Sequence, residues 1–156
     1  MQQAIFAAGC FWGPEAAFAA LPGVIETEVG YTGGTTEKPT YDDVCSHNTG
    51  HAEAIRLTFD PSKISYAALV EKFFEIHDPT QLNRQGPDFG DQYRSAIFTN
   101  SVEQKLTALK LKDHLQMSGR YKKSIATVIE PAKTFWRAEE VHQKYYEKRG
   151  GGSCHI

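Results

Sequence analysis

The chain has 156 residues, 40% of them hydrophobic, and its 17 basic residues nearly balance 19 acidic ones. This size suits one domain with a substantial apolar core. The balanced charge provides no basic surface for phosphate backbones or anionic lipids, which argues against nucleic acid and membrane as partners.

The N-terminal stretch from Ala4 to Leu21 is apolar, and its "AAGC" is similar to the cleavage site of an exported lipoprotein. An export signal begins with basic residues, however, whereas the first basic residue here is Lys38, and Glu15 interrupts the apolar run. No other run is long enough to span a membrane, so we expect a cytoplasmic protein. The three cysteines make no even disulfide framework, and free thiols suit that reducing compartment.

Taken in chain order, the first half predicts three strands and one helix. A strand over 2–9 precedes a helix over 14–21, which begins with proline and is followed by Pro-Gly. Residues 24–31 and 51–60 alternate their side chains as half-buried strands do. The Gly-, Thr- and Asp-rich segment 32–50 predicts a long loop, and loops of that length are often functional.

The second half predicts three more helices and two strands. The helix after Ser101 begins with a capping box to Gln104, and its apolar face includes Val102, Leu106 and Leu109 with Ala108, Leu111 and Leu115 beside it. The predicted elements are a helix over 65–77, a long loop over 77–92, a strand over 93–100, a helix over 101–117, a strand over 123–130 and a helix over 135–149.

The order β-α-β-β-α-β-α-β-α predicts an α+β fold. A ferredoxin-like split βαβ core, with a mixed or antiparallel sheet and helices packed on it, accounts for that order. We expect one catalytic domain over 1–149 and a flexible Gly-rich tail over 150–156.

Cys10 is the first candidate for chemistry. It lies where a strand ends and a helix begins, and unpaired N–H groups at a helix N-terminus favour the reactive thiolate. The alternative is a buried structural cysteine. Phe11 and Trp12 follow it, and because consecutive aromatics cannot both face one core, one of them should line a surface or a cleft.

Glu53 is unusual because it lies among apolar residues of a predicted strand. If Ala52 and Ala54 face one side, Glu53 faces the other alongside His51. Burial there would raise its pKa and let it act as an acid near neutral pH. The alternative is an ordinary solvent-facing strand residue.

Two other features leave their alternatives open. Cys45, His47 and His51 could form a metal site, but a zinc site needs a further ligand pair, and Cys154-His155 is remote in sequence, so we expect no metal. Cys154 follows three glycines and could reach about 20 Å from Lys148, as a mobile thiol that swings to a fixed one or as an incidental terminal residue.

The sequence closely resembles the peptide methionine sulfoxide reductase A family over nearly its whole length. The motifs that carry the resemblance occur in the family's order and are "GCFWGPE", "GYTGG", "PTYDDVC", "TGHAEA", "HDPT", "NRQG", "DQYRSAIF" and "FWRAEEVHQKYY". The resemblance implies reduction of the S epimer of methionine sulfoxide, free or in peptides and proteins, as a repair reaction with no bound cofactor.

The resemblance also implies roles for single residues. Cys10 would be the nucleophile, Phe11 and Trp12 would hold the substrate methyl group, and Glu53 would protonate the sulfoxide oxygen. The assisting phenols would be Tyr41 and Tyr93, the further polar group Asp88, and the recycling cysteine Cys154.

These roles fit the chemistry of the reaction. A sulfoxide sulfur is a weak electrophile until its oxygen is protonated, so a thiolate needs an acid and O–H donors nearby. Loss of methionine leaves Cys10 as a sulfenic acid, which Cys154 would convert to a disulfide. Thioredoxin, or dithiothreitol in vitro, would then reduce that disulfide.

The sequence departs from the family pattern at several places. Pro87 and Phe89 flank Asp88, where family members commonly have other residues, and Arg137 stands where proline is frequent. The C-terminal region has a single cysteine, which implies a one-step recycling path, and Cys45 is interpreted as structural.

Two hypotheses compete with the enzyme. One is a redox sensor or binding module for oxidised methionine, which needs a reactive thiol but no dedicated proton donor. The other is a metal-binding protein. Nothing in the pattern requires a partner surface, so we expect a monomer.

Overall fold

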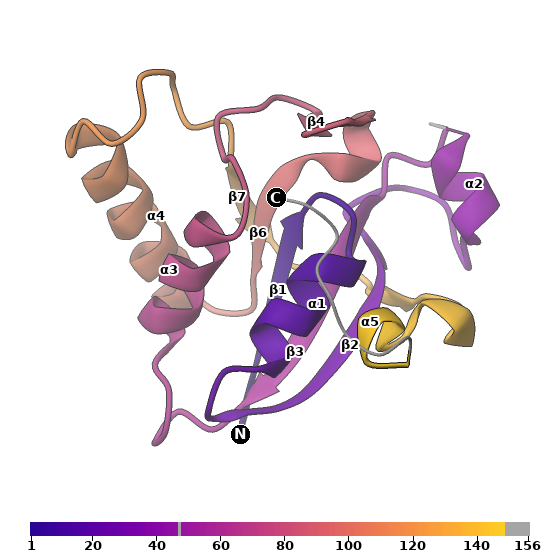
Figure 1. Cartoon of the computed structure of the whole chain (residues 1–156), viewed down its shortest axis with the longest axis horizontal. Helices are drawn as coiled ribbons and strands as arrows, with labels where there is room; N and C mark the ends of the chain where they lie inside the picture. The colour runs from indigo at the N-terminus through magenta and orange to yellow at the C-terminus, as the bar shows by residue number, and fades with distance from the viewer. Residues whose placement is uncertain (47, 149–156) are drawn as a thin grey trace.

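The computed structural model describes residues 1–46 and 48–148, and the predicted tail with Cys154 lies outside these ranges. At its centre is a βαββαβ unit (Figure 1) whose strands pair antiparallel in the order β6-β1-β3-β2. This is the ferredoxin-like core that the sequence predicts. Its elements are β1 (Gln2–Ala8), α1 (Trp12–Ala19), β2 (Val24–Thr32), β3 (Ala52–Phe59), α3 (Tyr66–Glu75) and β6 (Ser95–Thr99).

Further elements extend this core into a mixed six-stranded sheet of order β7-β6-β1-β3-β2-β8. Helix α4 (Val102–Met117) leads to β7 (Val128–Pro131), which runs parallel to β6. β8 (Trp136–Arg137) pairs antiparallel with β2. The strand predicted over 123–130 is β7, which begins only at Val128 and ends at Pro131.

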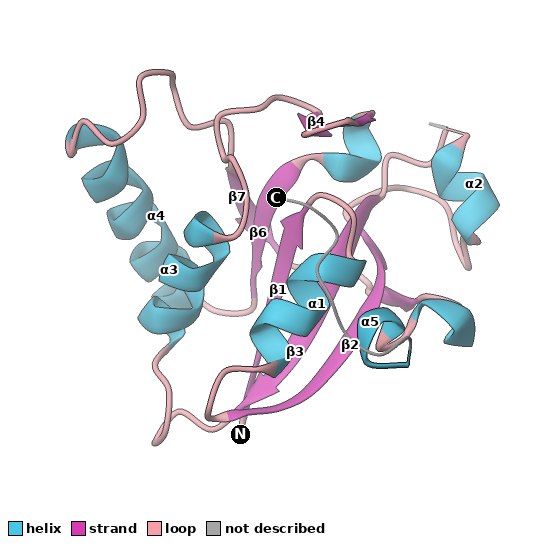
Figure 2. Ribbon diagram, viewed as in Figure 1, coloured by secondary structure: helices cyan, strands magenta, loops and turns pink. Residues whose placement is uncertain are grey.

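The alternation of β1 explains how the sheet is covered. Ala4, Phe6 and Ala8 belong to the larger apolar core, where Phe6 stacks on Phe18 of α1 at 5.2 Å and on Phe73 of α3 at 5.3 Å. Figure 2 shows α1 lying across this face of the sheet. A second core on the opposite face is covered by the segment between β7 and β8, and its members are Ile5, Ala7, Ala52, Ala54, Ala96 and Phe98, with Ala132 and Phe135.

The two predicted loops contain short elements. The first holds α2 (Tyr41–Cys45), which Thr40 caps by accepting a hydrogen bond from the Asp43 N–H while the Asp43 side chain accepts one from the Thr40 N–H. The second holds the hairpin β4 (Arg84–Gln85) and β5 (Asp88–Phe89), followed by the 3₁₀ turn η1 (Asp91–Tyr93). These elements are too short for their periodicity to be visible in the sequence.

The helix predicted over 135–149 is wrong. After β8 the chain forms the 3₁₀ turn η2 (Glu140–His142) and then α5 (Tyr145–Lys148), and we call residues 138–148 the C-terminal arm. The Ala138 N–H donates to the Val29 carbonyl oxygen at 2.9 Å, and the Gln143 amide bonds both the N–H and the carbonyl oxygen of Val29, each at 2.9 Å. The Ala138 N–H thus pairs with β2 instead of with a helical turn, and the Gln143 side chain satisfies backbone groups of β2, so the arm is held along β2 and does not form a continuous helix.

The apolar face predicted for α4 is only half correct. Val102 and Leu106 are 70% and 61% exposed, whereas Gln104 and Ala108 are buried and Leu111 and Leu115 pack on the core. The helix lies at the edge of the sheet beside α3, so a narrow stripe of its surface is covered. Among the described helices, none combines the length and the apolarity needed to cross a bilayer.

Candidate active site

Cys10 lies on the turn between β1 and α1, as predicted. Its thiol is partly exposed, and the next residue, Phe11, is the N-cap of α1. Gly9 has a φ of +92°, and a Cβ added there would lie 2.8 Å from the Cβ of Gln85. The turn therefore requires glycine before the cysteine, and it places the sulfur at the end of α1 where a thiolate is favoured.

Glu53 is buried beneath this turn. It lies opposite Tyr31 across the β2–β3 ladder and is 1% exposed, on the face opposite Ala52 and Ala54. The Phe11 N–H donates to Glu53 Oε1 at 3.3 Å. The solvent-facing alternative for Glu53 is thus excluded, and its carboxyl group is tied to the backbone directly after Cys10.

Tyr41 and Tyr93 reach the same region from α2 and η1. Burial raises the pKa of both phenols, and the electrostatic influence of the nearby Glu53 carboxyl group raises it further. The neighbouring Asp88 and Cys10 also raise the pKa of Tyr93. The two hydroxyl groups therefore stay protonated and can donate hydrogen bonds beside the carboxyl group.

Phe11 and Trp12 divide between core and surface, as predicted. Phe11 is fully buried 5.8 Å from the Tyr31 ring, whereas Trp12 is partly exposed. The Trp12 ring stacks on Tyr145 of the C-terminal arm at a centroid distance of 3.8 Å and an angle of 9°. The indole N–H donates to His142 Nδ1 at 3.2 Å.

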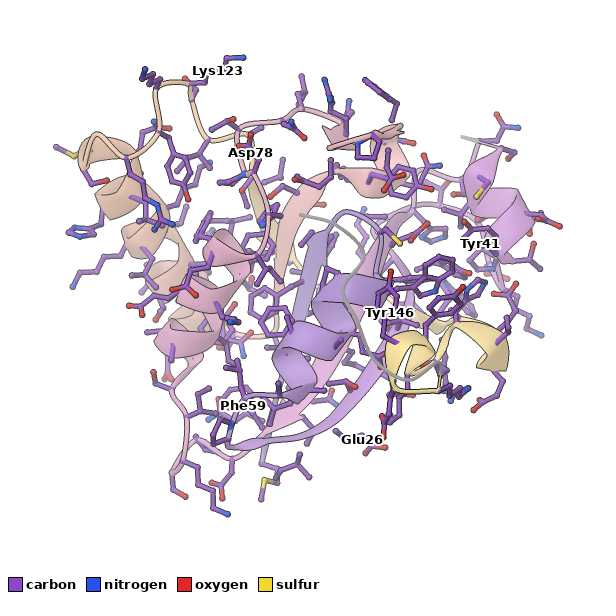
Figure 3. All side chains as sticks on the ribbon, viewed as in Figure 1. Glu26, Tyr41, Phe59, Asp78, Lys123 and Tyr146 are labelled. Atoms are coloured by element: carbon purple, nitrogen blue, oxygen red, sulfur yellow. The ribbon has the colours of Figure 1, made fainter. Side chains whose placement is uncertain are left out.

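The arm contributes two residues that the sequence reasoning missed. The ring of His142 lies 5.5 Å from Phe11 and 4.6 Å from Tyr41, so it joins the aromatic residues beside Cys10 (Figure 3 labels Tyr41). Glu139 accepts hydrogen bonds from the Tyr31 hydroxyl at 2.8 Å and from the Tyr41 N–H at 2.9 Å. Although burial opposes it, these bonds lower the pKa of Glu139 and keep it ionised. The only available signal was polar residues inside a segment that otherwise resembles an amphipathic helix.

Asp88 lies on the β4–β5 hairpin and near Tyr93. Pro87 and Phe89, the two neighbours at which the sequence departs from the family pattern, are exposed. Pro87 is exposed at the turn between β4 and β5, and Phe89 is 63% exposed with the Arg84 guanidinium 4.3 Å above its ring. Both side chains are therefore directed largely toward solvent. The third departure, Arg137, forms ion pairs with Glu28 at 3.1 Å and Glu140 at 2.9 Å.

The two described cysteines differ in environment. The Tyr41 phenol and the Cys45 thiol lie one turn apart on α2 and influence each other electrostatically. Burial raises the pKa of Cys45, and although Tyr41 opposes this, the net shift is upward, which keeps the thiol in its unreactive protonated form. Cys45 therefore contacts the group around Cys10 without the character of a nucleophile.

His51 binds the loop that precedes α2. Its Nδ1 accepts a hydrogen bond from the Gly34 N–H at 3.0 Å, and its Nε2 lies 2.8 Å from the Thr36 carbonyl oxygen. Both ring nitrogens are thus engaged by the loop before α2, which weakens the proposed metal set of Cys45, His47 and His51. His47 is outside the described residues, and within the described part no cluster of three or more His, Cys, Asp or Glu could hold a metal ion.

The geometry agrees with comparisons to known proteins. A family model described as peptide methionine sulfoxide reductase matches residues 2–156. The peptide methionine sulfoxide reductase MsrA of Methanoculleus marisnigri is 55% identical, over 99% of this chain and 94% of its own.

Two solved structures are also similar. Reduced Mxr1 from Saccharomyces cerevisiae matches with a TM-score of 0.91 and 37% identity, over 98% of this chain and 88% of that one. Mxr1 in complex with Trx2 matches with a TM-score of 0.64 and 28% identity, over 92% and 84%. The chain therefore belongs to the peptide methionine sulfoxide reductase family of oxidoreductases.

Proposed function

We propose that this protein reduces the S epimer of methionine sulfoxide, free or in polypeptides, to methionine. The observation that carries the proposal is the hydrogen bond from the Phe11 N–H to Glu53, which fixes a buried carboxyl group beside the nucleophile. A sensor of oxidised methionine would need the thiol but not this acid.

In the proposed reaction, the Cys10 thiolate attacks the sulfoxide sulfur while Glu53 donates a proton to the sulfoxide oxygen. Tyr41 and Tyr93, whose pKa values are raised by burial, donate hydrogen bonds to the same oxygen as it leaves sulfur. The hydroxyl group then moves to the Cys10 sulfur as the new bond between the two sulfurs breaks, and the electron pair of that bond stays on the substrate sulfur, which becomes a thioether. Cys10 loses this electron pair and receives the oxygen as a sulfenic acid.

Substrate orientation follows from the neighbouring rings. The partly exposed Trp12 would provide the apolar wall for the methyl group, supported from the core by the fully buried Phe11, while the oxygen faces the acid and the phenols. A binding site that distinguishes an apolar group from a hydrogen-bonding group on a chiral sulfur selects one epimer. Asp88 completes the polar side through its position next to Tyr93.

Recycling is assigned to Cys154, which lies outside the described residues. Its thiol would attack the Cys10 sulfenic acid, releasing water and forming a disulfide that a thioredoxin dithiol reopens by exchange. No bound cofactor is needed, and the thiol chemistry places the enzyme in a reducing compartment such as the cytoplasm. The complex of the related Mxr1 with Trx2 supports this partner.

The test measures methionine formed from separated S and R epimers with dithiothreitol as reductant. We expect reduction of the S epimer alone, and none by Cys10→Ser. An active Cys10→Ser variant, or equal rates for both epimers, would contradict the proposal.

A second measurement tests the recycling step. With thioredoxin as the only reductant, Cys154→Ser should release about one methionine per enzyme and then stop, because its sulfenic acid cannot form the disulfide. Sustained turnover by this variant would remove Cys154 from the pathway.

A further inference from the structure

Glu15 is a buried carboxyl group that the proposed reaction does not use. It lies in the first turn of α1 and is 2% exposed. Its Oε2 accepts a hydrogen bond from the Thr27 hydroxyl at 2.8 Å, and its Oε1 accepts one from the Lys144 N–H at 2.7 Å. The carboxyl group thus joins helix α1 and strand β2 to the C-terminal arm.

Lys144 is the residue at which the arm changes direction. Its φ of +50° lies in the left-handed region, which is unfavourable for a residue with a side chain and persists only where surrounding bonds hold it. Glu15 holds its N–H, and its own Nζ donates to the Thr27 carbonyl oxygen at 3.0 Å. This turn leads the chain from extended Gln143 into α5 and presents Tyr145 to Trp12.

Packing between α1 and α5 is incomplete at this point. A cleft of about 380 Å³ separates them, and its walls include Trp12, Glu15, Ala16, Lys144 and Tyr145. Because the side chains of the described residues do not fill this cleft, the hydrogen bonds to Glu15 contribute more to the placement of the arm than they would in a close-packed interface.

From these contacts we infer that Glu15 is a positioning residue for substrate binding. By holding the Lys144 turn, it keeps Tyr145 stacked on Trp12 and so fixes the indole before the substrate arrives. The inference rests on the proposed function, in which Trp12 receives the methyl group of the sulfoxide. Preorganised side chains bind more tightly because ordering them on binding costs nothing further.

The test compares three variants of the full chain in the dithiothreitol assay with the S epimer. Glu15→Ala loses both bonds, and Glu15→Asp is too short to make them together. A hydrogen bond to a charged group corresponds to a factor of about ten or more in an equilibrium, so we expect the KM of each variant to rise about fivefold or more, with kcat within about twofold. Glu15→Gln should keep a KM near that of the wild type, because its carbonyl oxygen can accept from the Lys144 N–H and its amide can donate to Thr27.

A matched control separates positioning from general destabilisation. Gln104 is 6% exposed and remote from the site, and its side chain also makes two bonds to backbone groups, of Asn100 and Gln3. Gln104→Ala should therefore weaken the fold without changing KM.

A spectroscopic readout reports on Trp12 itself. In a Trp136→Phe background, where Trp12 is the remaining tryptophan, acrylamide should quench the fluorescence of Glu15→Asp and Glu15→Ala more strongly than that of Glu15→Gln. If Glu15→Ala does not fold, Glu15→Asp alone carries the comparison.

Three results would overturn the inference: wild-type KM and quenching in Glu15→Asp, an equal KM increase in Gln104→Ala, or a Glu15→Gln variant as impaired as Glu15→Asp. An inactive wild-type enzyme would instead refute the proposed function. The two failures are therefore distinguishable.

Discussion

Replacing Glu53 by glutamine separates the chemical role of this side chain from its structural role. The amide oxygen of the introduced glutamine can still accept the hydrogen bond that the Phe11 N–H now makes at 3.3 Å, so the fold should be preserved. The amide is not acidic enough to transfer a proton to the sulfoxide oxygen at neutral pH. General acid catalysis contributes about 10²- to 10⁴-fold, and we expect kcat/KM for the S epimer to fall by about that factor.

Alanine at the same position should affect stability as well. It removes the acceptor for a buried N–H, which costs about 1–3 kcal/mol, and leaves a cavity in addition. Urea unfolding should therefore show a clear loss of stability for Glu53→Ala and little loss for Glu53→Gln, while both lose activity in the dithiothreitol assay. Cys10→Ser sets the background rate. A folded Glu53→Gln enzyme within about threefold of the wild-type rate would refute the assignment, because the proton would then come from another group.

Two further predictions concern residues outside the reaction centre. Burial lowers the pKa of His77 from 6.5 to about 4, so the unfolded chain takes up a proton that the folded protein excludes as the pH falls through this window. The free energy of unfolding from urea titrations should drop by about 2 kcal/mol between pH 7.5 and pH 5 from this residue, and His77→Gln should reduce that dependence; an unchanged pH dependence would contradict it. Glu139→Ala removes the acceptor of the Tyr41 N–H and should lower kcat about tenfold through misplacement of the phenol. The control Tyr31→Phe deletes only the bond from Tyr31 to Glu139 and should keep kcat; equal loss in both variants would argue against positioning through Tyr41.

The central fold could be predicted because its signals are local. The alternation in β1, β2 and β3 and the helical spacing in α3 each extend over enough residues to be recognised. Cys10 followed directly from this pattern, since it stands where a strand pattern gives way to a helix pattern. The same alternation placed Glu53 opposite Ala52 and Ala54.

The C-terminal arm could not be predicted because its conformation is set by distant partners. Residues 135–149 have the composition of an amphipathic helix. Gln143 instead bonds the backbone of Val29, and Lys144 takes a left-handed conformation held by Glu15. Tertiary bonds of this kind override intrinsic helix propensity, and sequence spacing carries no trace of them.

Because the conformation of the arm was not predicted, part of the site was not predicted either. The sequence alone therefore could not show that His142 lies beside Tyr41 or that Glu139 holds the Tyr41 N–H. It also could not show that Cys45 lies close enough to Tyr41 to influence its phenol. The exposed Val102 and Leu106 have a similar explanation, because spacing identifies an apolar stripe but not which side of a helix the neighbouring elements cover.

The place of β1 in the sheet has a consequence for how the site responds to different substrates. β1 is paired on both sides, with β3 and β6, so its amide protons can exchange with solvent only when the whole sheet opens. The short α2 is capped by Thr40 and held by the bond from the Tyr41 N–H to Glu139, far fewer bonds than hold β1, so we expect it to open at lower energetic cost than the sheet. We therefore expect Cys10 to be attached to a slowly exchanging part of the chain and Tyr41 to a more readily deformed one. If the proposed reaction holds, polypeptides with different residues around the oxidised methionine should be admitted by small shifts of α2, while the position of the Cys10 sulfur stays constant.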